Sequence, residues 1–176
     1  SMNDVKRKSV LSTLDPKKLE LILYPTEQCN FRCTYCYEDF SLGKMTPDII
    51  SGIKSLITER IGTINLLQIS WFGGEPLAAK DVIYEVCEHA QRECDKHGVL
   101  FAGNFTTNGY FLDVETARRL QGYSQGRYQI SLDGYADEWP QQAKAWTYVN
   151  HGKDRLGILT GVHERMFYTL LDVTDD

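Results

Sequence analysis

Residues 19–36, LELILYPTEQCNFRCTYC, place a short apolar run directly before three closely spaced cysteines. The apolar part, residues 19–24, is rich in Leu and Ile, which predicts a buried β-strand. Cys29, Cys33 and Cys36 then follow in a polar segment. Because thiolates are soft metal ligands, this arrangement predicts a metal site just beyond the end of a strand.

The same order, a strand and then a polar or glycine-rich segment, recurs three more times along the chain. Further strands are predicted over residues 64–72, 99–107 and 127–132, with the segments GGEP, TTNG and SLDG at their carboxyl ends. Helical periodicity lies between the strands, over residues 46–60, 80–97 and 113–121. Alternating strands and helices predict an α/β fold with a parallel sheet, and ligands bind at the carboxyl ends of such strands.

Two of the predicted helices have clear apolar stripes and end signals. Thr46 is expected to cap the first helix, with Pro47 in its first turn. Its stripe comprises Ile49, Ile50, Ile53, Leu56 and Ile57. The stripe of the second helix comprises Ile83, Val86, Cys87, Ala90 and Cys94. Gly98 is placed to end that helix, and the two cysteines on its stripe are expected to pack in the core.

Composition limits the classes of function. The chain has 176 residues, 42% hydrophobic and 24% charged, as in ordinary globular proteins. A formal net charge of −5 argues against a broad nucleic-acid surface, which requires a basic field. No apolar run approaches the roughly 20 residues that span a bilayer, so no membrane partner is expected. Five cysteines, an odd number, without a leader favour the reducing cytoplasm over a disulfide scaffold.

The three clustered cysteines allow three interpretations. They could be buried core thiols, although their polar surroundings argue against that. They could form a zinc site if a histidine supplied the fourth ligand; the candidates are His89, His97, His151 and His163. None of these histidines has a convincing spacing. The third interpretation is a 4Fe-4S cluster held by three thiolates, with one iron open to another ligand.

These motifs together resemble those of the radical S-adenosylmethionine (radical SAM) enzymes. The segments CTYCYE, WFGGEP, TTNG and ISLDG occur in the order typical of the peptide-modifying branch. That branch includes anaerobic sulfatase-maturating enzymes and SPASM-type peptide maturases. The resemblance covers roughly residues 19–134. It implies a parallel-stranded partial (β/α)6 TIM-like barrel, an α/β fold in which four βα-type strands are recognisable and the C-terminal part is divergent or truncated.

The resemblance assigns a role to each motif. Cys29, Cys33 and Cys36 would bind the cluster as thiolates, and SAM would chelate the fourth iron. Reductive cleavage of SAM would then give a 5′-deoxyadenosyl radical that takes a hydrogen atom from the substrate. Catalytic residues beyond these cofactor ligands are unknown.

The same resemblance places the remaining cofactor-binding residues around SAM. Gly73 and Gly74 would let the backbone approach the methionyl part, and Glu75 would balance its ammonium charge. Tyr35 would face the adenine, and Ser131 would bond the ribose or carboxylate. For Asp133, a turn residue and a cofactor ligand are both open. Asn108-Gly109 is either a turn or a substrate contact. Trp71 either lines the pocket or packs in the core.

The expected function is therefore a radical SAM oxidoreductase or maturase that modifies a peptide side chain. Its cofactors would be a 4Fe-4S cluster and SAM. Its partners would be a peptide or protein substrate and a reducing electron donor, with a homodimer possible through an exposed barrel edge. The alternative is a truncated, non-catalytic cluster-binding fragment or interaction partner.

The sequence departs from the family after Gly134. Relatives usually carry an arginine about twelve residues beyond the serine, whereas Ala143 stands there. The segments LGILTGV and MFYTLLDV predict an antiparallel hairpin, which would not continue a parallel barrel. We expect an N-terminal extension over residues 1–18, an incomplete radical SAM core over 19–134, and a divergent C-terminal segment over 135–176.

Overall fold

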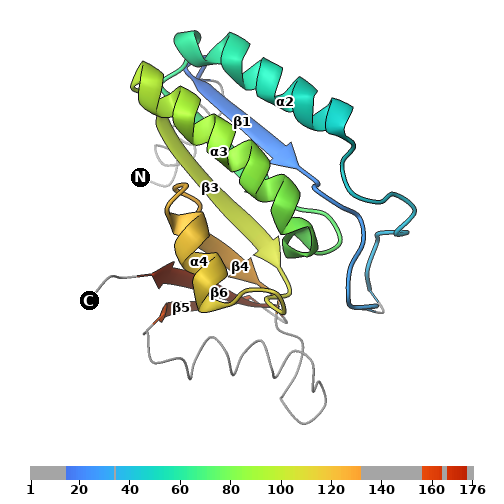
Figure 1. The fold of residues 1–176 in the computed structure, drawn as a ribbon. Coiled ribbons are helices and arrows are strands. Elements are labelled where there is room, and N and C mark those ends of the chain that lie inside the picture. The colour runs from blue at the N-terminus through green and yellow to red at the C-terminus, as the bar shows by residue number, and fades with distance from the viewer. Residues whose placement is uncertain (1–14, 34, 132–155, 164–165, 174–176) are drawn as a thin grey trace.

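A four-stranded parallel sheet covered by three helices organises the chain (Figure 1). The computed structural model describes residues 15–33, 35–131, 156–163 and 166–173. The main elements are β1 (Lys18–Leu23), α2 (Pro47–Arg60), β2 (Leu66–Trp71), α3 (Lys80–His97), β3 (Leu100–Thr107), α4 (Val114–Gln121), β4 (Arg127–Ile130), β5 (Leu156–His163) and β6 (Met166–Val173). The short 3-10 helices η1 (Ile61–Thr63) and η2 (Pro76–Ala79) follow α2 and precede α3.

The strands pair in the order β1-β2-β3-β4, and every pair is parallel. Leu23 pairs with Trp71, and Trp71 pairs with Phe105, so the carboxyl ends of β1 to β3 are level. The segments that leave these strands therefore begin at one edge of the sheet, which we call the carboxyl edge. The predicted partial parallel barrel of the α/β class is confirmed.

The side of the sheet covered by α2, α3 and α4 holds the hydrophobic core. Alternate residues of each strand point there, as the two-residue period of a strand requires. Trp71, Phe105 and Tyr128 stack in sequence across β2, β3 and β4, with ring centroids 6.0 and 5.4 Å apart. All three side chains are fully buried. Trp71 therefore packs in the core, which resolves the choice between packing and pocket lining.

The opposite face of the sheet carries polar side chains. Gln68 donates to Glu20 across β2 and β1 at 3.2 Å, and Asn104 donates to Ser70 across β3 and β2 at 3.1 Å. No described helix covers this side of the sheet (Figure 1). Ile22 and Leu100 lie exposed on this face as well, so one face is packed under helices and the other carries uncovered side chains of both kinds.

Helix α3 matches its prediction at both ends. It spans Lys80–His97 and ends at Gly98 in the left-handed conformation, and its predicted stripe is buried. Helix α2 departs in two respects. Thr46 occupies the N-cap position but its side chain makes no capping hydrogen bond. Ile49 and Leu56 are exposed, so the buried stripe of α2 is narrower than predicted.

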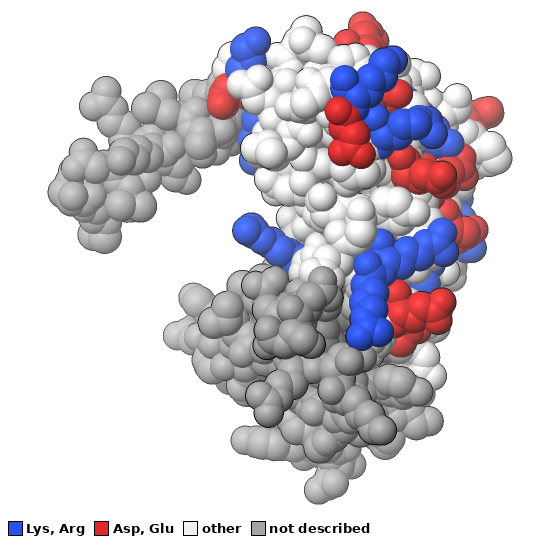
Figure 2. All heavy atoms as spheres, turned by 60° about the vertical axis from the view of Figure 1, so that its left-hand side comes forward, with Lys and Arg blue, Asp and Glu red and all other residues white. Residues whose placement is uncertain are grey.

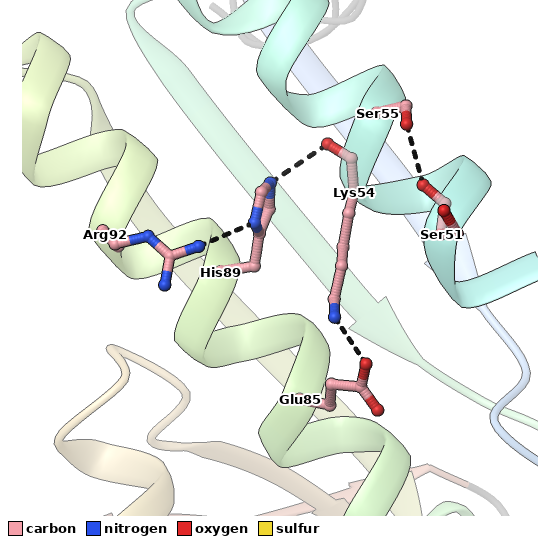
Figure 3. A network of polar contacts seen from close by, with 6 residues as sticks. All are labelled: Ser51, Lys54, Ser55, Glu85, His89 and Arg92. Carbon is pink, nitrogen blue, oxygen red and sulfur yellow. Dashed lines mark hydrogen bonds and ion pairs between the residues drawn. The ribbon is translucent and has the colours of Figure 1, made fainter. Parts of the chain in front are cut away.

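Polar contacts join α2 to α3 above their apolar faces (Figure 3). His89 on α3 lies 3.1 Å from the Lys54 carbonyl oxygen and 2.9 Å from the Thr58 hydroxyl on α2. Arg92 contacts the other ring nitrogen of His89 at 3.1 Å, and Lys54 pairs with Glu85. His89 is therefore engaged in holding two helices together, away from the carboxyl edge.

Strands β5 and β6 form a separate antiparallel hairpin, from Leu156 paired with Val173 to His163 paired with Met166. This confirms the predicted hairpin, and β6 lies beside β4. Asp133, Gly134 and the segment up to residue 155 lie outside the described residues, as do residues 1–14 of the expected N-terminal extension. The three predicted segment boundaries stay predictions.

Charge is mixed over the face of the molecule in Figure 2. Figure 2 shows Lys and Arg side chains next to Asp and Glu side chains over the face in view, rather than in one continuous basic field. This pattern agrees with the acidic net charge of −5 and does not favour nucleic-acid binding. In the described part of the chain, no helix combines the length and the apolar character that crossing a membrane requires.

Candidate functional site

The cysteines lie in a loop that leaves the carboxyl edge after β1. We call residues 29–39 the cysteine loop. Gln28, just before the loop, donates its side-chain amide to the carbonyls of Phe40 and Leu42, at 2.7 and 3.1 Å. The carboxylate of Glu27 accepts from the Leu42 backbone at 2.9 Å. These contacts close the base of the loop.

Arg32 folds back over the same loop. Its guanidinium donates to the carbonyls of Cys29 and Phe31, both at 2.7 Å, and lies 4.2 Å from the ring centre of Phe40. Phe31 is buried and packs edge-on against Tyr110, which follows β3. The cysteine loop is thus attached to the carboxyl edge by packing as well as by its stems.

The GGEP segment after β2 holds the start of the cysteine loop. Gly74 donates its N–H to the Thr26 carbonyl at 3.2 Å, and Glu75 donates to the Gln28 carbonyl at 3.0 Å. A Cβ on Gly74 would lie 2.1 Å from the Glu27 carbonyl oxygen, and one on Gly73 would lie 2.3 Å from that of Thr26. Gly73 also has φ of +116°, which side chains disfavour. The close approach that requires glycine is therefore to the protein's own chain.

Glu75 ties the end of β2 to the end of β3. Its side chain is fully buried. One carboxylate oxygen accepts from the Leu77 N–H at 2.9 Å and the Thr107 hydroxyl at 2.7 Å; the other accepts from the Asn108 N–H at 2.7 Å. Burial raises the pKa of Glu75, while these hydrogen bonds oppose that rise. The assignment of Glu75 to the ammonium group of SAM stays a prediction.

Asn108 connects β3 to the cysteine loop. Its side-chain amide donates to the Asn30 side-chain oxygen at 3.0 Å and to the sulfur of Cys29 at 3.7 Å. Its own side-chain oxygen accepts from the Tyr110 N–H at 2.9 Å. The residue forms the turn expected of Asn-Gly, and in addition it reaches a cysteine 79 positions earlier in the sequence.

The three cysteines of the loop have different surroundings. Cys29 is half-buried, and burial raises the pKa of its thiol, opposed by the N–H of Phe31, 3.3 Å from the sulfur. The nearby thiol of Cys33 also raises the pKa of Cys29. Cys36 is exposed. Cys36 donates its N–H to the Cys33 carbonyl at 3.0 Å, which turns the chain between them.

In its chemistry this donor set fits an iron–sulfur cluster: three thiols in one accessible loop, the first already accepting N–H hydrogen bonds. Its geometry is not yet that of a metal site. Among the described residues, no three His, Cys, Asp or Glu side chains are grouped closely enough to hold a metal ion. The set of cysteine ligands therefore stays a prediction.

The other two predicted SAM contacts lie at the same end of the sheet. Ser131 follows β4 and donates its N–H to the Thr107 carbonyl at 3.2 Å. Tyr35 lies in the cysteine loop with 62% of its surface exposed. Both assignments stay predictions. Cys87 and Cys94 are fully buried on α3, on the core side as expected.

Sequence reasoning missed the polar contacts that assemble this edge. Thr107, Gln28 and Glu27 had no assigned role. Thr107 joins the end of β3 to Glu75 after β2, and the side chains of Gln28 and Glu27 close the base of the cysteine loop. A signal was present for Thr107 and Asn108, because they stand where β3 ends, level with the other motifs. For Gln28 and Glu27, residue type alone does not identify the backbone groups that they bind.

Comparisons with known proteins agree with this architecture. The family model described as the Radical SAM superfamily matches residues 23–171. A GTP 3',8-cyclase of Peptoclostridium acidaminophilum is 31% identical over 141 residues, which are 79% of this chain and 40% of that protein. A PqqA peptide cyclase of Gluconobacter oxydans is 23% identical over 153 residues, which are 87% of this chain and 37% of that protein.

Solved structures show the same fold. The structure of anSMEcpe with bound AdoMet has a TM-score of 0.62 at 20% identity, covering 76% of this chain and 41% of that one. BtrN in complex with AdoMet and 2-DOIA has a TM-score of 0.51 at 20% identity, over 63% of this chain and 44% of that one. The chain spans about 40% of the length of the curated relatives described above. With four parallel strands, a cysteine loop at their carboxyl edge and a family match over residues 23–171, the chain belongs to the radical SAM superfamily.

Proposed function

We propose that this chain supplies the cluster- and SAM-binding part of a radical SAM enzyme that modifies a peptide side chain. Cys29, Cys33 and Cys36 would hold a 4Fe-4S cluster. When bound, the cluster and SAM supply reductive cleavage of a carbon–sulfur bond and hydrogen-atom abstraction. The observation that carries the proposal is the cysteine loop at the carboxyl edge, held by GGEP and TTNG.

The chain's own residues would bind and orient these groups. Gly73 and Gly74 hold the GGEP backbone against residues 26–28, so this backbone is fixed beside the cysteine loop. Under the proposal, that fixed backbone together with Glu75 binds the methionyl part of SAM. Tyr35 and Ser131 would contact its adenosyl part. Preorganised backbone groups bind a ligand with little ordering cost.

A peptide substrate is supported by two kinds of relative. PqqA peptide cyclases are among the sequence relatives, and structural neighbours include anSMEcpe with bound AdoMet and Cp18Cys peptide, at a TM-score of 0.60. The sequences of the motifs CTYCYE, WFGGEP, TTNG and ISLDG resemble those of the same peptide-modifying branch. The proposal further includes oxidoreductase chemistry, a reducing electron donor and a cytoplasmic location. It also includes contact between two copies of the chain through β1, because β1 pairs only with β2 among the described strands.

A second candidate substrate is a nucleotide. It is favoured by the GTP 3',8-cyclase of Peptoclostridium acidaminophilum, whose identity of 31% exceeds the 23% of the PqqA peptide cyclase of Gluconobacter oxydans. The comparison that separates the two candidates is turnover by the reconstituted protein with a Cys-containing peptide and with GTP. A third candidate is a non-catalytic cluster-binding fragment or interaction partner, which a test of SAM cleavage separates from an enzyme.

The experiment is anaerobic reconstitution with iron and sulfide, followed by SAM and a reductant. We expect close to four irons per chain and release of 5′-deoxyadenosine. A chain that binds the cluster and never cleaves SAM would support the non-catalytic alternative, and bound zinc in place of iron would contradict the proposal.

Two cysteine variants make this experiment specific. Cys33→Ala removes one proposed ligand, and we expect it to abolish both cluster assembly and SAM cleavage. Cys94→Ala removes a buried thiol on α3, away from the carboxyl edge, and is the matched control. Retained SAM cleavage in Cys33→Ala would refute the assigned ligand set.

A further inference from the structure

Asn108 forms contacts through its backbone N–H and through both polar atoms of its side chain. Its backbone N–H donates to the buried carboxylate of Glu75 at 2.7 Å, and its side-chain oxygen accepts from Tyr110 at 2.9 Å. The two remaining contacts, both from the side-chain nitrogen, go to Asn30 at 3.0 Å and to the sulfur of Cys29 at 3.7 Å. A turn-forming asparagine needs only the contact to Tyr110.

The orientation of this side chain is fixed from two sides. Glu75 is fully buried and holds the backbone of Asn108 together with the neighbouring Thr107 hydroxyl, 2.7 Å from the carboxylate. The Tyr110 N–H donates to the side-chain oxygen of Asn108, which directs that oxygen away from the cysteine loop. The side-chain nitrogen of Asn108 therefore faces Cys29. The donor is therefore oriented before any ligand binds.

A donor at this place acts on the sulfur of Cys29. An N–H group that points at a thiolate stabilises its negative charge. Hydrogen bonds to the sulfurs of an iron–sulfur cluster also set its reduction potential, because they stabilise the more negative, reduced state. Cys29 has one such donor from its own loop, the Phe31 N–H at 3.3 Å, and Asn108 is the second.

We propose that Asn108 is a positioning residue that fixes Cys29 at the carboxyl edge and raises the reduction potential of the cluster bound there. This inference rests on the proposed function, in which Cys29 is a cluster ligand. It assigns to the TTNG segment a role toward the metal site, in place of a turn or a substrate contact.

The main test is the midpoint potential of the reconstituted cluster, followed by its EPR signal during a redox titration. Asn108→Ala removes the donor without adding charge, and we expect its potential to be more negative than that of the wild-type chain. Asn108→Ser adds no charge, keeps a side-chain oxygen that can accept from Tyr110 and is too short to reach the sulfur, so it provides a second variant if Asn108→Ala does not fold. Unchanged potentials in these variants would overturn the inference.

Asn65→Ala is the matched control, because Asn65 is exposed and stands just before β2, at the opposite edge of the sheet. Its potential should equal that of the wild-type chain. A merely structural role for Asn108 would lower the amount of cluster held without moving its potential.

A measurement on the chain without a cluster separates this inference from the proposed function. Under reducing conditions, the rate at which iodoacetamide alkylates Cys29, measured relative to Cys36 by peptide mass spectrometry, should differ between Asn108→Ala and the wild-type chain, because Asn108 contacts the Cys29 sulfur. If the wild-type chain assembles no cluster, the proposed function fails while this ratio still decides the inference. An unchanged ratio would overturn it.

Discussion

The helix-covered face of the sheet and its carboxyl edge are held together by different forces. On the covered face, Trp71, Phe105 and Tyr128 form a buried aromatic stack beneath the helices. At the carboxyl edge, Glu75, Thr107 and Asn108 join the strand ends through hydrogen bonds. The first region depends on apolar area and close packing, and the second on satisfied buried polar groups.

This difference implies that the two regions tolerate change differently. A packed face loses stability in proportion to the volume removed. A polar edge loses both stability and geometry when a single donor or acceptor is removed, because its partner is left buried and unpaired. The four predictions below test this contrast through the free energy of unfolding, from the largest expected effect to the smallest.

Trp71→Ala should have the largest effect. Its side chain is fully buried, stacks on Phe105 and donates its indole N–H to Gln125, so we expect a loss of about 3–5 kcal/mol in the free energy of unfolding, measured by urea denaturation. Leu100→Ala is the control, because 71% of Leu100 is exposed; its expected change is within about 0.5 kcal/mol. Equal losses in the two variants would contradict the assignment of the core to the covered face.

Gly74→Ala should cost about 2–3 kcal/mol, since its Cβ would lie 2.1 Å from the Glu27 carbonyl oxygen and the backbone would have to shift. Gly52→Ala is the matched control. Gly52 lies within α2 with open space around its Cβ position, so alanine should stabilise the chain by about 0.5–1 kcal/mol. The two substitutions are chemically identical, and opposite signs in thermal or urea unfolding are the expected result.

Thr107→Val should cost about 1–2 kcal/mol near neutral pH, because it leaves the buried carboxylate of Glu75 without one donor. The hydroxyl favours the charged form and so lowers the pKa of Glu75; its loss raises that pKa further. A carboxyl whose folded-state pKa is raised loses stability as pH rises from its unfolded value toward its folded value. The cost should therefore be smaller at acidic pH, where Glu75 is protonated in both states.

Thr106→Val serves as the control for this series. Thr106 is the preceding residue of β3 and points to the opposite face of the sheet. Urea unfolding of both variants from pH 4 to pH 7 should show a pH-dependent difference only for Thr107→Val. A parallel pH dependence in Thr106→Val would place the titrating group elsewhere.

The ion pair between Lys54 and Glu85 should have the smallest effect. The side chains are 28% and 53% exposed, so solvent and salt screen their attraction. A double-mutant cycle with Lys54→Ala and Glu85→Ala should give a coupling of about 0.2–1 kcal/mol that decreases in 1 M salt. A coupling above 2 kcal/mol would mean that polar contacts support the helical side as strongly as they do the carboxyl edge.

Much of the covered face could be predicted from sequence, because periodicity reports burial directly. The stripe of α3 from Ile83 to Cys94 and the parallel strand order follow from that signal. The same reasoning predicted too wide a buried stripe on α2, because it included Ile49, which is exposed. On a helix with few neighbours, apolar residues at helical spacing are not all covered.

The carboxyl edge was predicted in its location and not in its contacts. The motifs mark where each strand ends, and parallel pairing brings those ends together. What Glu75 and Gly74 contact is set by residues of other strands, at Thr107 and at Glu27. Such contacts depend on side-chain and backbone geometry between distant segments, which a single sequence does not encode in any short pattern.

The clamp that Gln28 forms with Phe40 and Leu42 has a thermodynamic consequence for ligand binding. It joins positions 12 and 14 residues apart, so the ends of the cysteine loop are already together in the folded chain. Bringing the ends of such a segment together in a flexible chain costs roughly 2 kcal/mol in the length-dependent part of the loop-closure entropy. This entropy is lost when the chain folds, and not when the ligand binds. Drawing the three thiols around one ligand then requires ordering within the loop alone, which favours tighter binding than an unclamped peptide of the same sequence would show.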